Sequence, residues 1–306
     1  MSTLTSTPPQ APPPGRSLTE KAPNARRRGI LSRAMTVVLG ATVAAAIIPL
    51  VLVLWQVIAN GAPALSWEFF TTVEPLSYRD EGGGYLAGIV GTLYMTGVAA
   101  IVVIPVGILA AVYLTEYGTG TYAYVVRFFT DVMTGVPSVF VGLAVYALLV
   151  SGAGGAGLGF GTLAGAAALA ILMLPIVVRS TEEMLRLVPQ DLKNASYGLG
   201  ARRWQTTLKV TLPAAAPGIT TGAILAVARG AGETAPLILT ALGAREVVTR
   251  LWGAPQADVG LLMVDGFTQP FEAGITRAWA GGFTLIAIVF LLSVIARLIA
   301  SRSHAI

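Results

Sequence analysis

The sequence contains no cysteine and a single histidine, His304, which lies near the carboxyl end. Without cysteine the chain can form no disulfide and offers no thiolate ligand, although this leaves its redox compartment open. His304 is expected to lie in a solvated tail. Metal binding or acid–base chemistry by histidine is therefore not expected. Charged residues are also scarce, at 11% of the 306 residues.

The chain is instead rich in apolar residues. They make up 55% of it and the mean hydropathy is +0.74, values that exclude an ordinary soluble globule. The sequence therefore predicts an all-α, polytopic membrane protein surrounded by lipid. A net charge of +5 would also suit nucleic-acid binding. The basic residues do not form one patch, however, so no nucleic-acid partner is expected.

Six apolar runs are long enough to cross a bilayer, which takes about 20 residues. They cover residues 35–59, 88–114, 128–150, 162–178, 214–242 and 279–300. The basic start of the first run and the triplet Ala62-Pro63-Ala64 resemble a signal peptide, but the run is too long for one and is expected to be retained. We predict a disordered basic tail over residues 1–34, a six-span domain over 35–300 and a short tail over 301–306.

The basic residues indicate which side of the membrane each loop faces. Fifteen of the 20 lie on the side of the amino terminus, four lie on the other side, and Arg229 lies within a span. By the positive-inside rule, both termini and the polar segment over residues 189–213 are predicted to be cytoplasmic. The outer loops over residues 61–85 and 243–276 carry eight carboxylates, which would help to orient a docking protein.

The segment over residues 189–213 is too polar to cross a bilayer. Its spacing is Asn194-Ala195-Ser196, three residues, Gly200, nine residues, Val210, one residue and Leu212-Pro213. This spacing resembles the "EAA" loop of ABC-transporter permeases, in which a helix pair docks in a groove of a cytoplasmic ATPase. The resemblance assigns ATPase coupling to Asn194, Ala195, Ser196, Gly200, Leu212 and Pro213.

Two features of this segment bear on docking. Glycine accepts backbone angles that allow two short helices to meet closely, and Tyr197, Leu199, Trp204, Leu208 and Val210 could form an apolar stripe for a groove. Asn194 stands where the permeases usually have an acidic residue, so a salt bridge to the ATPase at this position is in doubt. The alternative is an ordinary basic cytoplasmic loop.

The fifth apolar run contains two charged residues, Arg229, roughly midway along it, and Glu233, four residues later. A charge at the centre of a span costs about 2.5 to 3.5 kcal/mol and calls for a partner or a water-filled path. A guanidinium suits phosphate oxygens, so we predict an anion route in which Glu233 neutralises Arg229 when no substrate is present. A structural ion pair is the alternative. Arg179 is a second candidate contact, although the positive-inside rule also explains a basic residue there.

Five further motifs make the resemblance specific. They are Glu81-Gly82-Gly83-Gly84, Tyr113 to Gly118, Pro137 to Gly142, Pro175 to Glu182 and Ala228 to Pro236. Together they resemble the PstA family, one of the two permeases of bacterial phosphate ABC transporters, over nearly everything from the first span to the last. The resemblance implies an ABC importer type I permease fold, a place in a bacterial plasma (inner) membrane and import of inorganic phosphate. Arg229 and Glu233 match the arginine and glutamate of the family motif that are thought to matter for transport.

The resemblance also implies the partners. They are a second, related permease, a pair of cytoplasmic ATPases and an extracytoplasmic phosphate-binding protein. The glycine-rich stretch over residues 151–161 is not followed by the Lys-Ser or Lys-Thr of a phosphate loop, so ATP and Mg are expected on the ATPase, and no cofactor on this chain. We expect a transporter subunit and not an enzyme.

Two other classes of protein fit the sequence less well than a permease subunit does. A self-contained ion-coupled carrier could use Arg229 and Glu233 as its site, but no inverted repeat of broken helices is seen and the segment over residues 189–213 would have no role. An intramembrane enzyme would need a buried Asp pair, a Ser/His arrangement or a metal-ligand cluster, and the sequence shows none of these.

Overall fold

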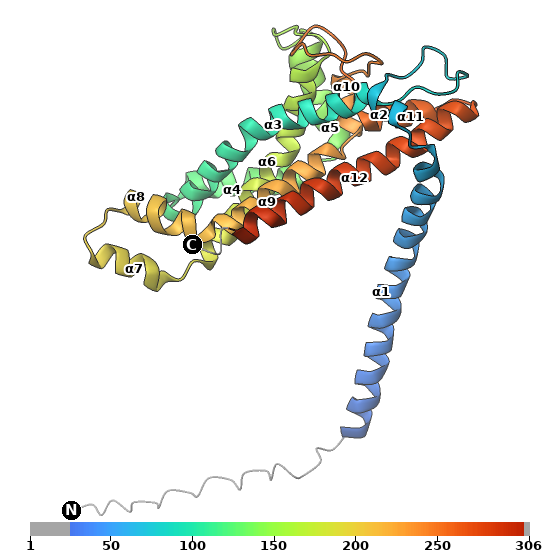
Figure 1. The fold of residues 1–306 in the computed structure, drawn as a ribbon. Helices are drawn as coiled ribbons and strands as arrows, with labels where there is room; N and C mark the ends of the chain where they lie inside the picture. Colours follow the sequence, from blue (N-terminus) through green and yellow to red (C-terminus); the bar gives the residue numbers. More distant parts are fainter. Residues whose placement is uncertain (1–24, 303–306) are drawn as a thin grey trace, which may run out of the picture. The chain divides into compact units, whose positions relative to one another are not determined.

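The structure is a computed structural model that describes residues 25–302, and these form helices joined by turns and loops. Within the described range, five helices are long and apolar enough to cross a membrane, or six if one bent pair counts as a single span. The long helices are α1 (Ala25–Gly61), α3 (Leu86–Val112), α6 (Thr162–Leu187), α9 (Leu212–Ala231) and α12 (Glu272–Arg302) (Figure 1). The predicted all-α membrane fold is confirmed.

Shorter helices connect the spans. They are η1 (Ala62–Ala64), α2 (Trp67–Thr71), η2 (Tyr113–Tyr117), α4 (Thr121–Gly135), α5 (Ser138–Val145), η3 (Tyr146–Val150), α7 (Gln190–Gly198), α8 (Arg203–Thr206), η4 (Thr207–Thr211), α10 (Ala235–Thr240) and α11 (Val259–Thr268). Of these, η2, η3 and η4 are π-helical turns.

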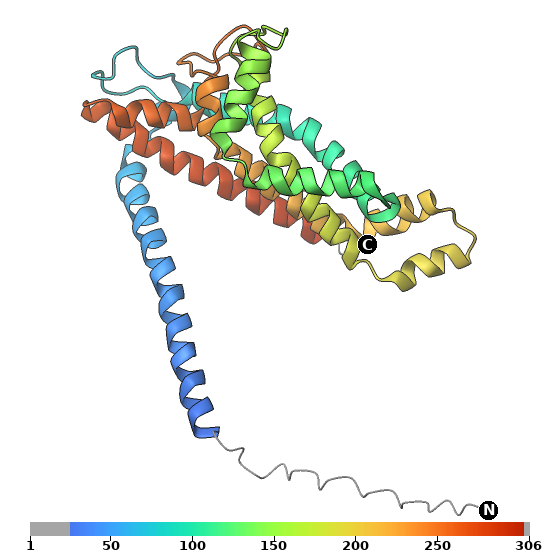
Figure 2. The same ribbon diagram turned by 180° about the vertical axis from the view of Figure 1, so that it is seen from behind.

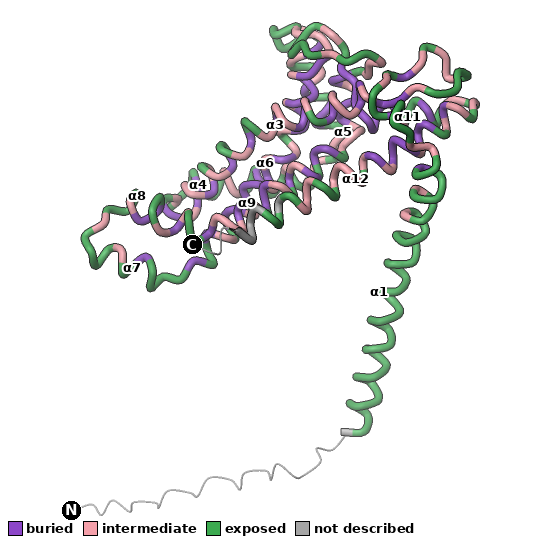
Figure 3. The backbone as a smooth tube through the Cα atoms, viewed as in Figure 1, coloured by how far each residue is buried: buried purple, intermediate pink, exposed green. Residues whose placement is uncertain are grey.

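The chain divides into two units, residues 1–55 and residues 56–306. In the first unit, the described residues all belong to α1, and the side chains from Arg26 to Val53 are exposed (Figure 3). Such a surface suits lipid or another membrane helix. The predicted disordered tail over residues 1–34 is wrong for residues 25–34, which are helical. Arginine and alanine are good helix formers, so the helix begins before the apolar run does. Residues 1–24 and 303–306 lie outside the described range.

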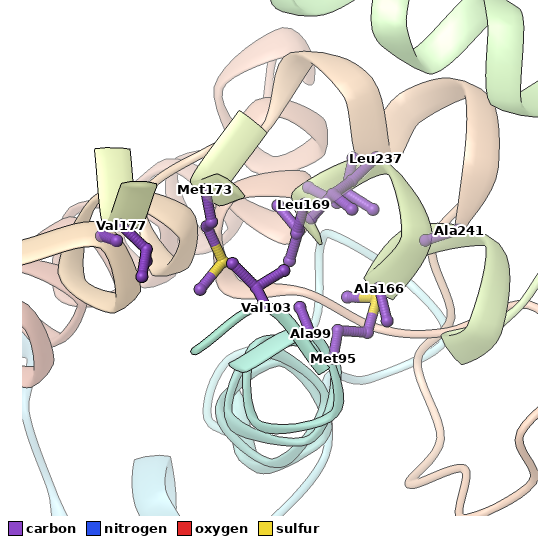
Figure 4. Packing of buried hydrophobic residues seen from close by; sticks show 11 residues of the cluster. Met95, Ala99, Val103, Ala166, Leu169, Met173, Val177, Leu237 and Ala241 are labelled. Atoms are coloured by element: carbon purple, nitrogen blue, oxygen red, sulfur yellow. The ribbon is translucent and has the colours of Figure 1, made fainter. Parts of the chain in front are cut away.

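The core of the second unit lies where α3, α6 and α9 pack together. Met95, Ala99 and Val103 of α3 meet Leu169 and Met173 of α6 (Figure 4). Small residues allow these helices to approach closely, as is usual between membrane helices. At Gly230 of α9, for example, a Cβ would lie 2.7 Å from the sulfur of Met173. The core therefore fixes which face of α9 is turned inward.

The third predicted span is not a straight helix over residues 128–150. Helices α4 and α5 meet at an angle of 108° (Figure 2). The bend falls at Val136 and Pro137, where Val136 has an extended backbone with φ −74° and ψ 126°. Proline disfavours the helical conformation in the residue before it and has no N–H to donate, so the helix stops there.

The fifth predicted span, residues 214–242, is also interrupted. Helix α9 ends at Ala231, and α10 begins at Ala235 after a three-residue break. Pro236 lies in the first turn of α10, the place in a helix where proline is favoured. The predicted outer loop over residues 243–276 is wrong in part, because it contains all of α11 and the first turn of α12.

A buried carboxylate joins three segments of the second unit that are far apart in the chain. Glu74 has a fully buried side chain, and its Oε2 lies 3.3 Å from Nε of Arg245. Its Oε1 lies 4.0 Å from Nε of Arg277, on α12. Burial raises the pKa of Glu74, while the two guanidinium groups oppose this shift. The pairing holds the segment after α2 against segments that lie about 170 and 200 residues later in the chain.

Candidate substrate path and coupling segment

Arg229 lies in the last turn of α9, not midway along a span as its sequence position suggested. The helix breaks soon after it, and Nη2 of Arg229 lies 3.4 Å from Oε1 of Glu233. The arginine side chain is 64% exposed, whereas that of Glu233 is only 17% exposed. The structure therefore brings the two predicted residues together, with the guanidinium as the accessible partner.

The helix end places both members of the pair. Arg229 follows the exposed Thr221 and Leu225 at four-residue spacing, so it lies on the face of α9 that is turned away from the core. The backbone N–H of Glu233 donates to the carbonyl of Gly230 at 3.2 Å, which folds the chain back past the end of α9. The pair thus spans a helix terminus and is not built on a continuous helix. A guanidinium held here can present two parallel N–H donors to an oxyanion.

Arg179 belongs to a different cluster. Its Nη2 pairs with Asp131 of α4, and both side chains are about half exposed. A cavity of about 190 Å³ is lined by Arg127, Asp131, Arg179, Glu182, Glu183 and Arg186. Within it, Oε1 of Glu182 accepts from Arg127 at 3.0 Å and from Arg186 at 2.5 Å. The structure pairs Arg179 with α4 and not with Arg229.

Asp131 and Glu182 were not predicted from the sequence as partners in this cluster. The four-residue spacing of Glu182 and Arg186 on one helix could have indicated their pairing. The pairings of Arg127 with Glu182 and of Arg179 with Asp131 join residues about 50 positions apart, for which the sequence holds no signal.

The segment over residues 189–213 folds as α7, a turn, and α8, which runs through η4 into α9 without a break. Gly200 lies in that turn with φ +83°, a conformation that favours glycine. Oγ of Ser196 on α7 lies 2.9 Å from Oγ1 of Thr206 on α8, which links the two helices. Leu212 and Pro213 form the first turn of α9, so the segment continues directly into a span. The predicted helix pair and its glycine turn are both present.

The apolar side chains of this segment are largely uncovered. Tyr197, Leu199, Trp204 and Leu208 are exposed, and Leu199 is 91% exposed. Val210 is only half-buried. Asn194 and Ala195 also lie on the exposed surface of α7, and the amide oxygen of Asn194 accepts from Nε2 of Gln190 at 3.5 Å. The surface is suited to a partner with an apolar groove.

The described residues thus contain apolar spanning helices, one of them sharply bent, and a projecting helix pair between two of them. This combination defines a permease subunit of an ABC importer. The chain belongs to the family of binding-protein-dependent transport system inner membrane components, whose model matches residues 103–304.

Similar proteins agree with this assignment. The phosphate transport system permease protein PstA 1 of Mycobacterium tuberculosis (strain ATCC 25618 / H37Rv) is 40% identical over 278 residues, which cover 89% of this chain and 88% of that protein. PstA of Haemophilus influenzae is 38% identical and covers 80% of this chain and 85% of its own length.

Two solved transporters share the fold. An inward-facing MetNI methionine ABC transporter has a TM-score of 0.60 and 21% identity over 71% of this chain and 95% of that chain. A bacterial alginate ABC transporter has a TM-score of 0.61 and 14% identity over 92% of this chain and 98% of that chain.

Proposed function

We propose that this chain is the membrane-spanning permease subunit of an ATP-driven importer of inorganic phosphate. The observation that carries the proposal is Arg229, whose guanidinium is exposed at a helix end among apolar helices while Glu233 stays close enough to balance its charge. The named relatives are phosphate transport permeases, which supports phosphate as the anion. Their family also argues against a self-contained ion-coupled carrier.

The proposed path lies between this chain and a second, related permease, so neither chain alone transports. Arg229 binds the phosphate through two N–H groups, and Glu233 releases the guanidinium as the substrate arrives. Arg179 serves as a second contact nearer the cytoplasm, where Asp131 takes the corresponding balancing role. A carboxylate beside each arginine keeps the path from holding phosphate too tightly to release it.

The driving force comes from partners of this chain. A pair of cytoplasmic ATPases binds ATP and Mg and closes around the helix pair α7 and α8, while Ala195, Gly200 and their neighbours transmit that closure to the spans. A phosphate-binding protein docks on the outer loops. Both termini are cytoplasmic in this arrangement, which follows from the distribution of the basic residues.

The test is phosphate uptake together with ATP hydrolysis in vesicles that hold the whole reconstituted complex. We expect Arg229→Gln to lower uptake about 100-fold, because a charge-assisted contact is worth up to about 3 kcal/mol. Assembly and basal ATP hydrolysis should persist. Arg33→Gln is the matched control, since Arg33 is also exposed but belongs to α1, to which no role in the path is assigned. If uptake survives in Arg229→Gln, the pair is structural and the route lies elsewhere.

A further inference from the structure

The end of α3 is where the projecting helix pair meets the spans through polar side chains. The π-helical turn η2 contains Glu116, whose Oε1 accepts from Nζ of Lys193 on α7 at 2.5 Å. The guanidinium of Arg203, on α8, lies 4.9 Å from the ring centre of Tyr117. Both short helices therefore touch the same five-residue turn. π-helical turns inside longer helices are often found at functional sites.

The contact between Lys193 and Glu116 is buried, which sets it apart from the rest of α7. Their side chains are 10% and 6% exposed, whereas the ion pair of Arg179 and Asp131 is about half exposed. Lys193 is the one residue of α7 that is buried. An exposed ion pair contributes little, but removing one partner of a buried pair leaves an uncompensated charge, so the two groups stay together strongly.

The turn that receives Lys193 is itself tied to the bundle. Nη2 of Arg127, on α4, donates to the carbonyl of Leu114 at 2.7 Å. Leu114 and Ala111, at the same end of α3, pack in a buried cluster with Leu185 of α6. A force on η2 is therefore transmitted to α3, α4 and α6. The chain itself connects α7 directly only to α6, and α8 continues into α9.

We propose that the ion pair of Lys193 and Glu116 fastens α7 to the end of α3, so that movement of the helix pair is delivered to α3 as well as to the spans that continue its backbone. Lys193 and Glu116 are positioning residues and do not contact substrate or ATP. The inference rests on the proposed function, because it presumes that α7 and α8 move with an ATPase. It assigns α3, the helix at the centre of the core, as a direct receiver of that movement.

The absence of native cysteine allows a direct test in the complete complex. The variant Glu116→Cys with Lys193→Cys loses the ion pair, and we expect its phosphate uptake per ATP hydrolysed to fall about tenfold. A bismaleimide reagent whose span matches the two lost side chains should then join the cysteines and restore the ratio. Restoration within one folded sample would show that the connection itself matters, beyond any contribution of the pair to stability.

Two results would overturn the proposal. One is an unchanged ratio in the variant before reagent is added, and the other is complete cross-linking, shown by mass, without restoration. If the variant does not assemble, the exchange Glu116→Lys with Lys193→Glu takes its place. Recovery of coupling relative to Glu116→Lys alone would support the fastening, and equal coupling in the two would contradict it.

The controls separate this inference from the proposed function. Arg33→Cys removes an exposed charge from α1, to which no role in coupling is assigned, and, with the reagent present, should leave the ratio unchanged. The unaltered complex must itself take up phosphate and hydrolyse ATP. If it does neither, the proposed function fails. If the unaltered complex and the double-cysteine variant take up the same amount of phosphate per ATP hydrolysed, only the proposed fastening is contradicted.

Discussion

At the scale of single residues, Asp258 shows how burial changes a carboxyl group. It precedes α11, and its side chain accepts from Oγ1 of Thr92 at 2.6 Å and from the N–H of Leu261 at 3.2 Å. Complete burial raises its pKa from 3.8 to about 6, although both hydrogen bonds oppose the shift. Between these two pH values the folded state keeps a proton that the unfolded state has lost, so rising pH removes stability.

We therefore expect Asp258→Asn to raise the unfolding temperature of the detergent-solubilised protein at pH 8 and to have little effect at pH 4. Asparagine can still cap α11 and cannot ionise. The pKa difference corresponds to about 3 kcal/mol, which is the upper bound of the gain. Thermal unfolding of both forms from pH 4 to pH 8 measures it. A difference between them that does not change with pH would mean that ionisation of Asp258 does not affect folding.

Residues differ in how far the sequence could predict their roles. Arg229 and Glu233 stood out because two charges in an apolar run are costly, and the structure pairs them. Lys193 did not stand out, because a lysine in a basic segment is unremarkable and Glu116 is 77 residues away. The roles proposed for Arg229, Glu233 and Arg179 in transport stay predictions.

At the scale of elements, the turn between α7 and α8 depends on one glycine. Gly200 has φ +83°, and no atom lies within 4 Å of the place where a Cβ would be. A side chain there would meet no steric obstacle, so the cost of a substitution is conformational alone. Gly198, at the end of α7, also has open space around it but not a positive φ. Gly198 can therefore serve as the control position for a substitution at Gly200.

We expect Gly200→Ala to destabilise the helix pair by about 1 kcal/mol, the usual cost of the left-handed conformation for alanine. The apparent affinity of the ATPase for the reconstituted permeases should fall about fivefold. Gly198→Ala should leave it unchanged or slightly higher, because alanine favours helix. A binding titration with purified ATPase measures both variants. Equal affinities for the two would show that the turn is not needed for docking.

Helix ends were harder to predict than helices. Pro137 and Pro236 are visible in the sequence, but apolar residues surround both, so hydropathy alone predicted one span across each. The structure bends the chain by 108° near Pro137, and α10 begins at Ala235, one residue before Pro236. Proline limits the helix locally, whereas the angle after it is set by what the next helix packs against, and hydropathy says nothing about that.

At the scale of the whole molecule, the division of basic residues predicts which ends of the spans face the cytoplasm. The described helices show where spans begin and end. The cysteine-free sequence makes this measurable, since a single introduced thiol has no competitor. Ala153 and Thr249 lie in exposed segments that are predicted to face outward, while Ala195 lies on the exposed surface of α7.

With the complex in intact cells, we expect a membrane-impermeant maleimide to label Ala153→Cys and Thr249→Cys and to leave Ala195→Cys unlabelled. Opening the membrane should make Ala195→Cys reactive. Gly29→Cys, on the basic first turns of α1, should behave like Ala195→Cys. Labelling of Ala195→Cys from outside would reverse the proposed orientation and would place α7 and α8 out of reach of a cytoplasmic ATPase.

The sequence was enough to predict the all-α membrane fold, the places of most spans and the glycine turn after α7. These properties depend on residues close together in the chain, where hydropathy, charge and backbone preference act locally. The folded structure was needed to find the bend at Pro137, the break after Arg229 and the ion pair of Lys193 with Glu116. Each of these depends on packing or pairing between distant segments, which come together only when the chain folds.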